Sequence, residues 1–187
     1  MKTEQTFHVL IPTAFGTMSI VWWEAVTGPR IQRVFLRKGQ RPVEEDVREE
    51  YPNVQSFSCP EIAELCEQLQ RFLEGEAVDF RLEIVALEQC GEFQRRVLLA
   101  EYGIPRGWVS TYGRIAEQVG VGGGARAVGR ALATNPFPII IPCHRAVRGD
   151  GEVGGYQGGT GMKRALLEME GVEFTNEGKV LMRRVYY

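Results

Sequence analysis

Histidine and cysteine are scarce in this chain of 187 residues, and long apolar stretches are missing from it. Only two histidines and four cysteines are present, and no two cysteines are spaced as a CxxC pair. A tetrahedral zinc site needs four such ligands close together, so the sequence predicts no bound metal. We expect Cys59, Cys66 and Cys90 to be small buried apolar residues, and a disulfide between the first two is disfavoured in a reducing compartment.

No apolar run approaches the roughly 20 residues that a membrane-spanning helix needs. The first residues, 1–13, lack a basic start that is followed by a long apolar stretch and a small-residue cleavage site, which is the pattern of a secretory signal. We therefore expect a cytoplasmic protein without a membrane partner. Coiled-coil heptads and long exposed apolar stretches are also not evident, so we expect a monomer.

Charge is unevenly distributed along the chain, although the formal net charge is only −2. Residues 1–90 contain 9 Lys and Arg against 15 Asp and Glu, whereas residues 91–187 contain 13 against 9. Between Phe93 and Arg148 there are eight arginines and only two acids. A basic segment in an acidic protein can steer a polyanion such as a nucleic acid, although a solvated surface has the same composition.

The first half of the chain has the pattern of a small α+β unit. Two β-rich runs, Met18–Trp23 and Ile31–Leu36, flank the turn residues Thr27–Arg30, which predicts a hairpin. Phe7–Ile11 and Phe80–Ile84 are two further candidate strands. A helix is predicted from Pro60 until just before Gly75, with one apolar face made by Ile62, Leu65, Cys66, Leu69, Phe72 and Leu73.

The second half is predicted to be mostly helical, with domains at residues 1–88 and 89–187. The first helix of this half has Phe93, Val97 and Leu98 as apolar positions, and a second helix follows a cap at Ser110 or Thr111. After a glycine-rich break, a short helix is expected from about Ala125 to Ala133, ended by Asn135-Pro136. This helix pair is a candidate helix-turn-helix, with Arg126 and Arg130 on one face and Val128 and Leu132 toward the core.

The stretch Phe137–Arg145 is the most informative for chemistry. An apolar, β-branched run predicts a buried strand that ends at Pro142 and delivers Cys143 in a rigid position. The nucleophilic form of cysteine is the thiolate, so a neighbouring base or cation must lower the pKa of the thiol. His144 is adjacent in sequence, but successive side chains can point apart, and a buried inert cysteine has the same local pattern.

The motif Ile141-Pro-Cys-His-Arg145 resembles the active-site motif of the O6-alkylguanine-DNA alkyltransferases, also called methylated-DNA–protein-cysteine methyltransferases. Further blocks stand in the family's order and spacing, so that the resemblance is strong from about Phe93 to Gly171 and covers the N-terminal half only by size and pattern. These blocks are Val109–Ala116, Ala125–Gly129, Asn135–Pro138, Val153–Gly159 and Leu167–Gly171.

The resemblance implies a fold, a reaction and a role for each matching residue. The fold would be an N-terminal, ribonuclease-H-like sheet and helix followed by a helical domain with a helix-turn-helix. Cys143 would accept the alkyl group, His144 would take the thiol proton through a water, Glu170 would orient His144, and Tyr112 would hydrogen-bond the guanine. The DNA-binding residues would be Thr111, Ala125, Arg126, Ala127 and Arg130, and the substrate pocket would include Asn135, Pro138, Gly154, Tyr156, Gln157 and Gly158.

The implied activity is direct repair of double-stranded DNA. The alkyl group of O6-alkylguanine, with O4-alkylthymine as a second candidate substrate, would move irreversibly to Cys143 after the base has been flipped out of the duplex. Arg126 would fill the vacated stack, on a helix whose small residues allow a close approach to the minor groove. The reaction needs no cofactor, and each protein would act once, because a thioether has no easy hydrolysis route.

Gln157 and the lack of N-terminal zinc ligands depart from the pattern of some relatives. Other functions remain open on the residues alone. An alkyltransferase-like damage sensor would lack the motif cysteine, which is present here. A cysteine hydrolase would use Cys143, His144 and Glu170 with turnover, and would leave Arg126 and Asn135 without a role. A helix-turn-helix regulator would bind a sequence without preferring damage. The residues from Val172 to Tyr187 suggest no role.

Overall fold

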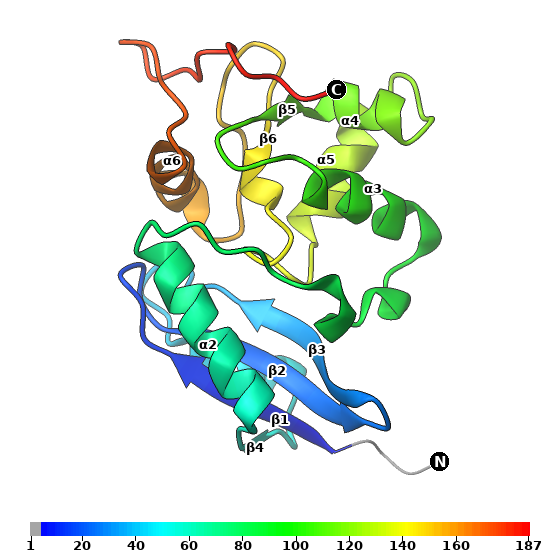
Figure 1. The fold of residues 1–187 in the computed structure, drawn as a ribbon, viewed down its shortest axis with the longest axis vertical. Coiled ribbons are helices and arrows are strands. Elements are labelled where there is room, and N and C mark those ends of the chain that lie inside the picture. The colour runs from blue at the N-terminus through cyan, green and yellow to red at the C-terminus, as the bar shows by residue number, and fades with distance from the viewer. Residues whose placement is uncertain (1–4) are drawn as a thin grey trace. The chain divides into compact units, whose positions relative to one another are not determined.

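The computed structural model describes residues 5–187, and the chain divides into two compact units between Ala86 and Leu87. Residues 1–4, with which the predicted N-terminal domain begins, lie outside the described part. Helices and strands are both well represented (Figure 1), so the expected α+β class is confirmed. None of the helices in the described residues has the length and apolar character of a membrane span.

The first unit is built on a small mixed sheet in the order β3-β2-β1-β4. The predicted hairpin is confirmed, because β2 and β3 pair antiparallel around a turn that is shorter than expected, so that Gly28 already begins a strand. The predicted strand at Phe7–Ile11 is β1, which pairs antiparallel with β2 and parallel with β4. The strands are β1 (Thr6–Ile11), β2 (Met18–Ala25), β3 (Gly28–Phe35) and β4 (Gln55–Ser56).

Two helices accompany this sheet. The predicted helix is α2 (Pro60–Leu73), which lies across the sheet in Figure 1 and buries the predicted apolar face except for the partly exposed Cys66. The sequence did not indicate α1 (Val43–Glu50). Only Val43 and Val47 of this helix are apolar and buried, where they join Val21 and Phe35 in one cluster.

The prediction of a strand at Phe80–Ile84 is wrong. The chain forms a short 3-10 helix, η1 (Leu82–Ile84), and meets β3 through a bridge between Val85 and Ile31 and a hydrogen bond of 2.6 Å from the Arg30 guanidinium to the Glu83 carbonyl. Phe80 packs on Phe72 of α2, with ring centroids 5.6 Å apart. Of the three alternating apolar residues only Phe80 is buried, whereas Leu82 and Ile84 lie in the 3-10 helix and are partly exposed.

In the second unit, three helices contact one another beside a two-stranded parallel sheet. The sheet joins β5 (Ser110–Thr111) to β6 (Ala146–Val147), with Ser110 opposite Ala146. This short pairing holds the two residues before α4 beside the two residues that follow Arg145, and thus fixes two predicted parts of the site next to each other. The helices are α3 (Glu92–Tyr102), α4 (Tyr112–Gln118), α5 (Ala125–Ala133) and α6 (Gly159–Met169), of which the first three contact one another.

The connection from β5 to α5 follows the sequence prediction closely. Of the two candidate caps, Thr111 is the one that caps α4, because its hydroxyl accepts a hydrogen bond of 3.2 Å from the backbone of Arg114. The glycine-rich break begins at Gly120, whose φ of 72° is a left-handed conformation that favours glycine. Helix α5 has the predicted bounds, and Val128 and Leu132 are buried as expected.

The C-terminal segment, for which the sequence suggested no role, is a strap along β5. The backbone of Val109 donates to Arg184 over 3.0 Å and accepts from Tyr186 over 2.8 Å. The Ser110 hydroxyl donates to the Tyr186 carbonyl over 2.8 Å, and the Tyr187 hydroxyl donates to Ala100 of α3 over 2.8 Å. The strap therefore braces the strand that leads into Tyr112.

Candidate active site

Cys143 does not follow a strand, which corrects the prediction from the apolar run. The chain turns tightly, with Ile139 at a φ of 74° and the Ile141 N–H donating to the Phe137 carbonyl over 2.8 Å. The Cys143 N–H then donates to Ile141 over 2.7 Å around Pro142, whose φ and ψ of −77° and 56° form an inverse γ-turn. Prolines at 136, 138 and 142 lack the N–H that a strand needs, so Cys143 begins a 3-10 helix, η3 (Cys143–Arg145).

Asn135 holds this strained turn in place. A β-branched residue at positive φ costs on the order of 1–3 kcal/mol and persists only where its surroundings enforce it. The fully buried Asn135 side chain accepts from the Phe137 N–H over 2.9 Å and donates to the Ile141 carbonyl over 3.2 Å. The Asn135 side chain also acts to lower the pKa of the Cys143 thiol, against the effect of burial. Asn135 thus lies beneath the predicted pocket and connects the end of α5 to the cysteine turn.

His144 and Glu170 meet in a buried cluster with Arg145. The Nε2 atom of His144 lies 2.8 Å from Oε1 of Glu170, the residue that caps the end of α6. The Arg145 guanidinium donates to both oxygens of the same carboxylate over 2.9 Å and to the Ile104 carbonyl over 2.5 Å. Sequence reasoning missed the role of Arg145, although the residue belongs to the quoted motif.

The charges in this cluster set the resting protonation states. Burial opposes ionisation of Glu170, but hydrogen bonds from His144 and Arg145, together with the positive charge of Arg145, outweigh it and lower the pKa of Glu170 to about 2. Burial lowers the pKa of His144 below its usual 6.5, against the opposing effect of Glu170. The imidazole is therefore neutral at pH 7 and can accept a proton.

The thiol itself is protonated at rest. Burial raises the pKa of Cys143 to about 12, although the Asn135 side chain favours the thiolate. The side chain is nonetheless accessible, because Cys143 lines a cavity of about 300 Å³, the lower end of the usual range for ligand pockets, about 300–1,000 Å³. The cavity walls also contain Tyr112, Gly129, Leu132, Ala133, Gly155, Tyr156 and Gln157.

Not every residue predicted for the pocket lies on its wall. Of that set, Tyr156 and Gln157 line the cavity, and Gln157 also donates to the Asn135 carbonyl over 2.7 Å. Gly154 supports the wall from behind, because a Cβ there would lie 2.8 Å from the Tyr112 hydroxyl. Pro138 and Gly158 are not among the lining residues.

A wider groove of about 560 Å³ adjoins this cavity and shares Tyr112 with it. The predicted DNA-binding residues Thr111, Ala125 and Arg126 come together in its walls, whereas Ala127 and Arg130 are exposed on α5 outside it. Arg148 also lines the groove, where it pairs with Asp150 over 2.9 Å, and it was not predicted. The groove therefore brings two arginines to the mouth of the cysteine cavity.

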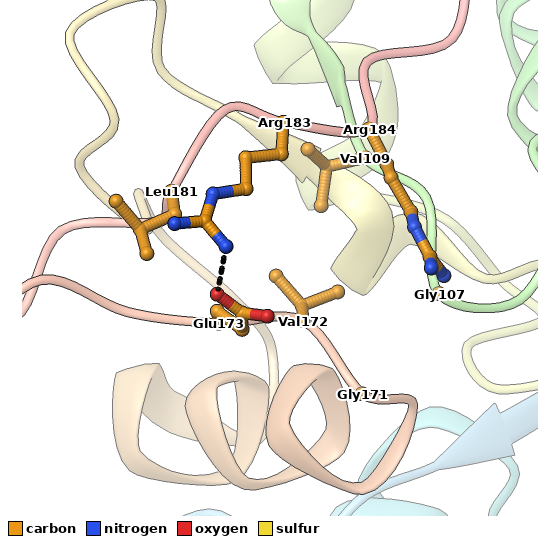
Figure 2. Close-up of a pocket in the computed structure, with 8 residues that line it drawn as sticks. All are labelled: Gly107, Val109, Gly171, Val172, Glu173, Leu181, Arg183 and Arg184. Atoms are coloured by element: carbon orange, nitrogen blue, oxygen red, sulfur yellow. Dashed lines mark hydrogen bonds and ion pairs between the residues drawn. The ribbon is translucent and has the colours of Figure 1, made fainter.

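A third hollow, of about 180 Å³, lies between the C-terminal strap and the residues that follow α6. Figure 2 shows Arg183 reaching across it to Glu173, an ion pair of 2.8 Å, while Arg184 points toward Gly107. None of its lining residues is a nucleophile or a predicted site residue. Among residues 5–187, no group of three His, Cys, Asp or Glu side chains is arranged to hold a metal ion.

The second unit matches a known protein family. Residues 92–172 match the family model described as 6-O-methylguanine DNA methyltransferase, DNA binding domain. The chain is 47% identical over 116 residues to the methylated-DNA–protein-cysteine methyltransferase of Methanothermobacter thermautotrophicus, which covers 62% of this chain and 65% of the relative. It is 39% identical over 132 residues to that of Archaeoglobus fulgidus, covering 67% and 86% of the two chains.

The likeness extends to solved structures. The crystal structure of Mycobacterium tuberculosis OGT in complex with DNA is similar with a TM-score of 0.70 and 31% identity, over 88% of this chain and 92% of that chain. By sequence, the chain spans just under two-thirds of the Methanothermobacter relative's length. The match to the A. fulgidus protein covers 67% of this chain and the match to the M. tuberculosis structure covers 88%, so both extend beyond the DNA-binding domain at residues 92–172.

Proposed function

The chain belongs to the methylated-DNA–protein-cysteine methyltransferase family, and we propose that it repairs DNA by taking the alkyl group from O6 of an alkylated guanine onto Sγ of Cys143. The observation that carries this proposal is the position of one thiol. Cys143 lies at the inner wall of a base-sized cavity, directly before a buried cluster of His144, Arg145 and Glu170.

We propose that neutral His144 acts as the base, through a water molecule, while Glu170 and Arg145 fix the imidazole in place. The Cys143 thiol gives up its proton, and the thiolate attacks the alkyl carbon. An S–C bond forms as the C–O6 bond breaks, and the electron pair remains on the guanine. Tyr112 lies on the same cavity and would donate a hydrogen bond to the ring that receives this charge.

The product is a thioether, which water does not hydrolyse readily. Each chain would therefore act once and would be consumed as a stoichiometric reagent. A cysteine hydrolase built on the same residues would instead turn over on an ester or a peptide, which the stoichiometry of the reaction distinguishes.

Access to the damaged base requires it to leave the duplex, because O6 of a paired guanine lies inside the stack. We propose that α4 and α5 act as a helix-turn-helix on the minor groove, with Arg126 filling the space that the flipped nucleotide vacates. Thr111, Ala125, Ala127 and Arg130 would contact the backbone around it. The groove that joins Arg126 to the cysteine cavity through Tyr112 supports this route.

The remaining expectations are part of the same proposal. The two compact units would be separate domains, a ribonuclease-H-like scaffold and a domain for DNA binding and alkyl transfer. The protein would act as a cytoplasmic monomer on alkylated guanine in double-stranded DNA, and O4-alkylthymine is a second candidate substrate.

Peptide mass spectrometry tests the proposed transfer directly. After incubation with a duplex that carries one O6-methylguanine, we expect the peptide containing Cys143 to gain the mass of one methylene group, and the matching undamaged duplex should give no gain. Methylation at Cys59, Cys66 or Cys90 in place of Cys143, or no methylation at all, would rule the proposal out.

Replacing Arg126 by alanine should impair repair of duplex DNA selectively. Unstacking a base costs a few kcal/mol, so loss of the side chain that fills the gap is expected to slow transfer from a duplex about ten- to a hundredfold. Transfer from a single-stranded oligonucleotide with the same lesion should be nearly unchanged, because no partner stack has to be filled. Single-turnover rates on both substrates give the ratio.

Arg130→Ala is the matched control on the same helix. Loss of a single phosphate contact should weaken binding to every duplex and lower the slope of log binding constant against log salt concentration by about 1. It should leave the ratio of the duplex rate to the single-strand rate unchanged. Equal slowing of both substrates by Arg126→Ala would refute the role proposed for Arg126.

A further inference from the structure

Arg148 and Asp150 line the groove beside the cysteine cavity, and the function proposed above gives neither residue a role. Both belong to the turn that follows β6 (Ala146–Val147), shortly after Cys143. The Arg148 guanidinium donates from Nη2 to the Asp150 carboxylate over 2.9 Å, and both side chains are exposed. Within residues 5–187, the structure gives this guanidinium no other hydrogen bond. Because an exposed ion pair stabilises a fold little, breaking this one costs little.

The turn from Arg148 to Glu152 holds the backbone of the arginine at the groove. The Arg148 N–H donates to the Glu152 carbonyl over 2.9 Å, and the Gly151 N–H donates to the Arg148 carbonyl over 3.0 Å. The Asp150 carboxylate also accepts from the Glu152 N–H over 3.2 Å, through the oxygen that does not meet Arg148. The Gly151 carbonyl in turn accepts from the Val180 N–H over 2.8 Å. The backbone of Arg148 is thus fixed, whereas its side chain can change partner.

The groove is the place where the backbone of a flipped nucleotide is expected. Its walls are the start of α4, the start of α5 with Arg126, and the turn with Arg148. Tyr112 lines both the groove and the cysteine cavity, so the two hollows adjoin. When a base occupies the cavity, the phosphates of the same nucleotide therefore lie at its mouth, in the groove. Among the described residues that line the groove, the charged ones are Arg126, Arg148 and Asp150.

We propose that Arg148 binds the phosphate next to the flipped nucleotide, and that Asp150 holds the guanidinium in the groove until the DNA strand arrives. The inference rests on the proposed function, because it needs a DNA strand in the groove. A guanidinium matches the geometry of a phosphate and can donate two parallel N–H bonds to it. The exchange therefore replaces one hydrogen bond to Asp150 by a bidentate contact, and it releases counterions from the DNA.

The carboxylate of Asp150 is expected to oppose DNA binding. It competes with the phosphate for Arg148, and its negative charge repels the strand. An asparagine at this position can still accept the Glu152 N–H through its amide oxygen, so the turn should persist. Asp150→Asn should therefore accelerate transfer from a duplex about two- to fivefold at low salt. A slower or an unchanged rate in Asp150→Asn would overturn the proposal.

Single-turnover transfer from an O6-methylguanine duplex, measured below saturation at several salt concentrations, tests the role of Arg148. Arg148→Ala should slow transfer about five- to tenfold at low salt. It should also lower the slope of log rate against log salt concentration by about 1. The double variant Arg148→Ala, Asp150→Asn keeps the net charge of the wild type and should lose the same slope. If this double variant keeps the wild-type rate and slope, net charge alone matters and the proposal is overturned.

Arg164 and Glu168 of α6 provide a matched control pair. They are also exposed and ion-paired over 2.9 Å, and neither is among the residues that line the groove. The double variant Arg164→Ala, Glu168→Gln removes the same two charges and should keep the wild-type rate and slope. A loss in this control equal to that of Arg148→Ala, Asp150→Asn would mean that any exposed ion pair has the effect, and would overturn the proposal.

A neutral methylphosphonate in the DNA locates the contact. Placed in turn at each phosphate next to the lesion, it should slow the wild type at one of them and slow Arg148→Ala little further there, because that contact is already lost. Additive losses at both phosphates would overturn the proposal. If the wild type transfers no methyl group, the proposed function fails, but the lesion stays intact and fluorescence anisotropy gives the same salt slopes for Arg148. A wild type that binds no duplex would overturn both.

Discussion

Serine in place of Cys143 is expected to abolish alkyl transfer while the protein still folds and binds damaged DNA. Oxygen is smaller than sulfur, so the hydroxyl fits the space of the thiol, and Asn135 still holds the turn through Phe137 and Ile141. A hydroxyl is a far weaker acid than a thiol, however, and neutral His144 cannot ionise it sufficiently for attack on an alkyl carbon. Transfer should fall below detection, whereas the free energy of unfolding should change by only about 1 kcal/mol.

Binding to an O6-methylguanine duplex, measured by fluorescence anisotropy, separates chemistry from recognition in this variant. Cys66→Ser, at a partly exposed cysteine of α2, is the matched control and should transfer at the wild-type rate. Retained methylation in Cys143→Ser would place the acceptor elsewhere, and loss of damaged-DNA binding would show that the sulfur also serves recognition.

Glu170→Gln is expected to slow transfer and to destabilise the second unit together. The carboxylate holds His144 and neutralises the buried Arg145, and an amide can do only part of the first and none of the second. Positioned acid–base groups contribute typically 10²–10⁴-fold to a rate, so we expect a loss of about a hundredfold or more. Removing one partner of a buried ion pair costs roughly 3–5 kcal/mol. Single-turnover kinetics and urea unfolding measure the two effects.

The stability difference should also depend on pH in a defined direction. The pKa of Glu170 is lowered from 4.5 to about 2 in the folded chain, so its contribution is fully present above pH 4.5 and is lost as the pH falls through about 2. The gap between wild type and Glu170→Gln should therefore narrow across that window. Glu168→Gln, whose carboxylate is exposed, should show no such gap. A gap that stays constant down to pH 2 would contradict the ion-pair role.

The apolar periodicity and the helix-ending residues of the sequence predicted those helices whose bounds depend on neighbouring residues. Helix α2 has a full apolar stripe, and α5 is bounded by glycine before it and Asn135-Pro136 after it, so both were found. Helix α1 buries only two valines, which is too weak a period to recognise. Phe80–Ile84 has the alternation of a strand, but Phe80 packs on Phe72 of α2 and the residues after it form a 3-10 helix.

The cysteine turn shows where local reasoning fails at the site. Its β-branched residues indicated a strand, and nothing in the local sequence predicted the positive φ of Ile139. That conformation depends on the side chain of Asn135, which is tied to both sides of the turn. The order of the motif blocks still predicted Cys143, His144 and Tyr112 as site residues, because the resemblance spans the whole turn.

Buried charges were the part of the site that sequence could not supply. Arg145 bonds to Ile104 and Glu170, and Lys163 bonds to Ala146 and Tyr112, across long separations in the chain. In a sequence, a lysine or a glutamate on a helix has the pattern of a solvated face. Only the tertiary arrangement of η3 and α6 brings these two side chains into buried hydrogen bonds with distant parts of the chain.

The measurement that most directly tests the claim of a single accepting sulfur is an intact-mass titration with damaged DNA in large molar excess. We expect the wild-type chain to stop at one added methyl group, however long the incubation, and Cys143→Ala to gain none. Duplexes with an unmodified guanine at the damaged position should form in equal amount to methylated protein. Repair of more than one guanine per chain, or methylation of Cys143→Ala, would contradict alkyl transfer to Cys143 as the function of this protein.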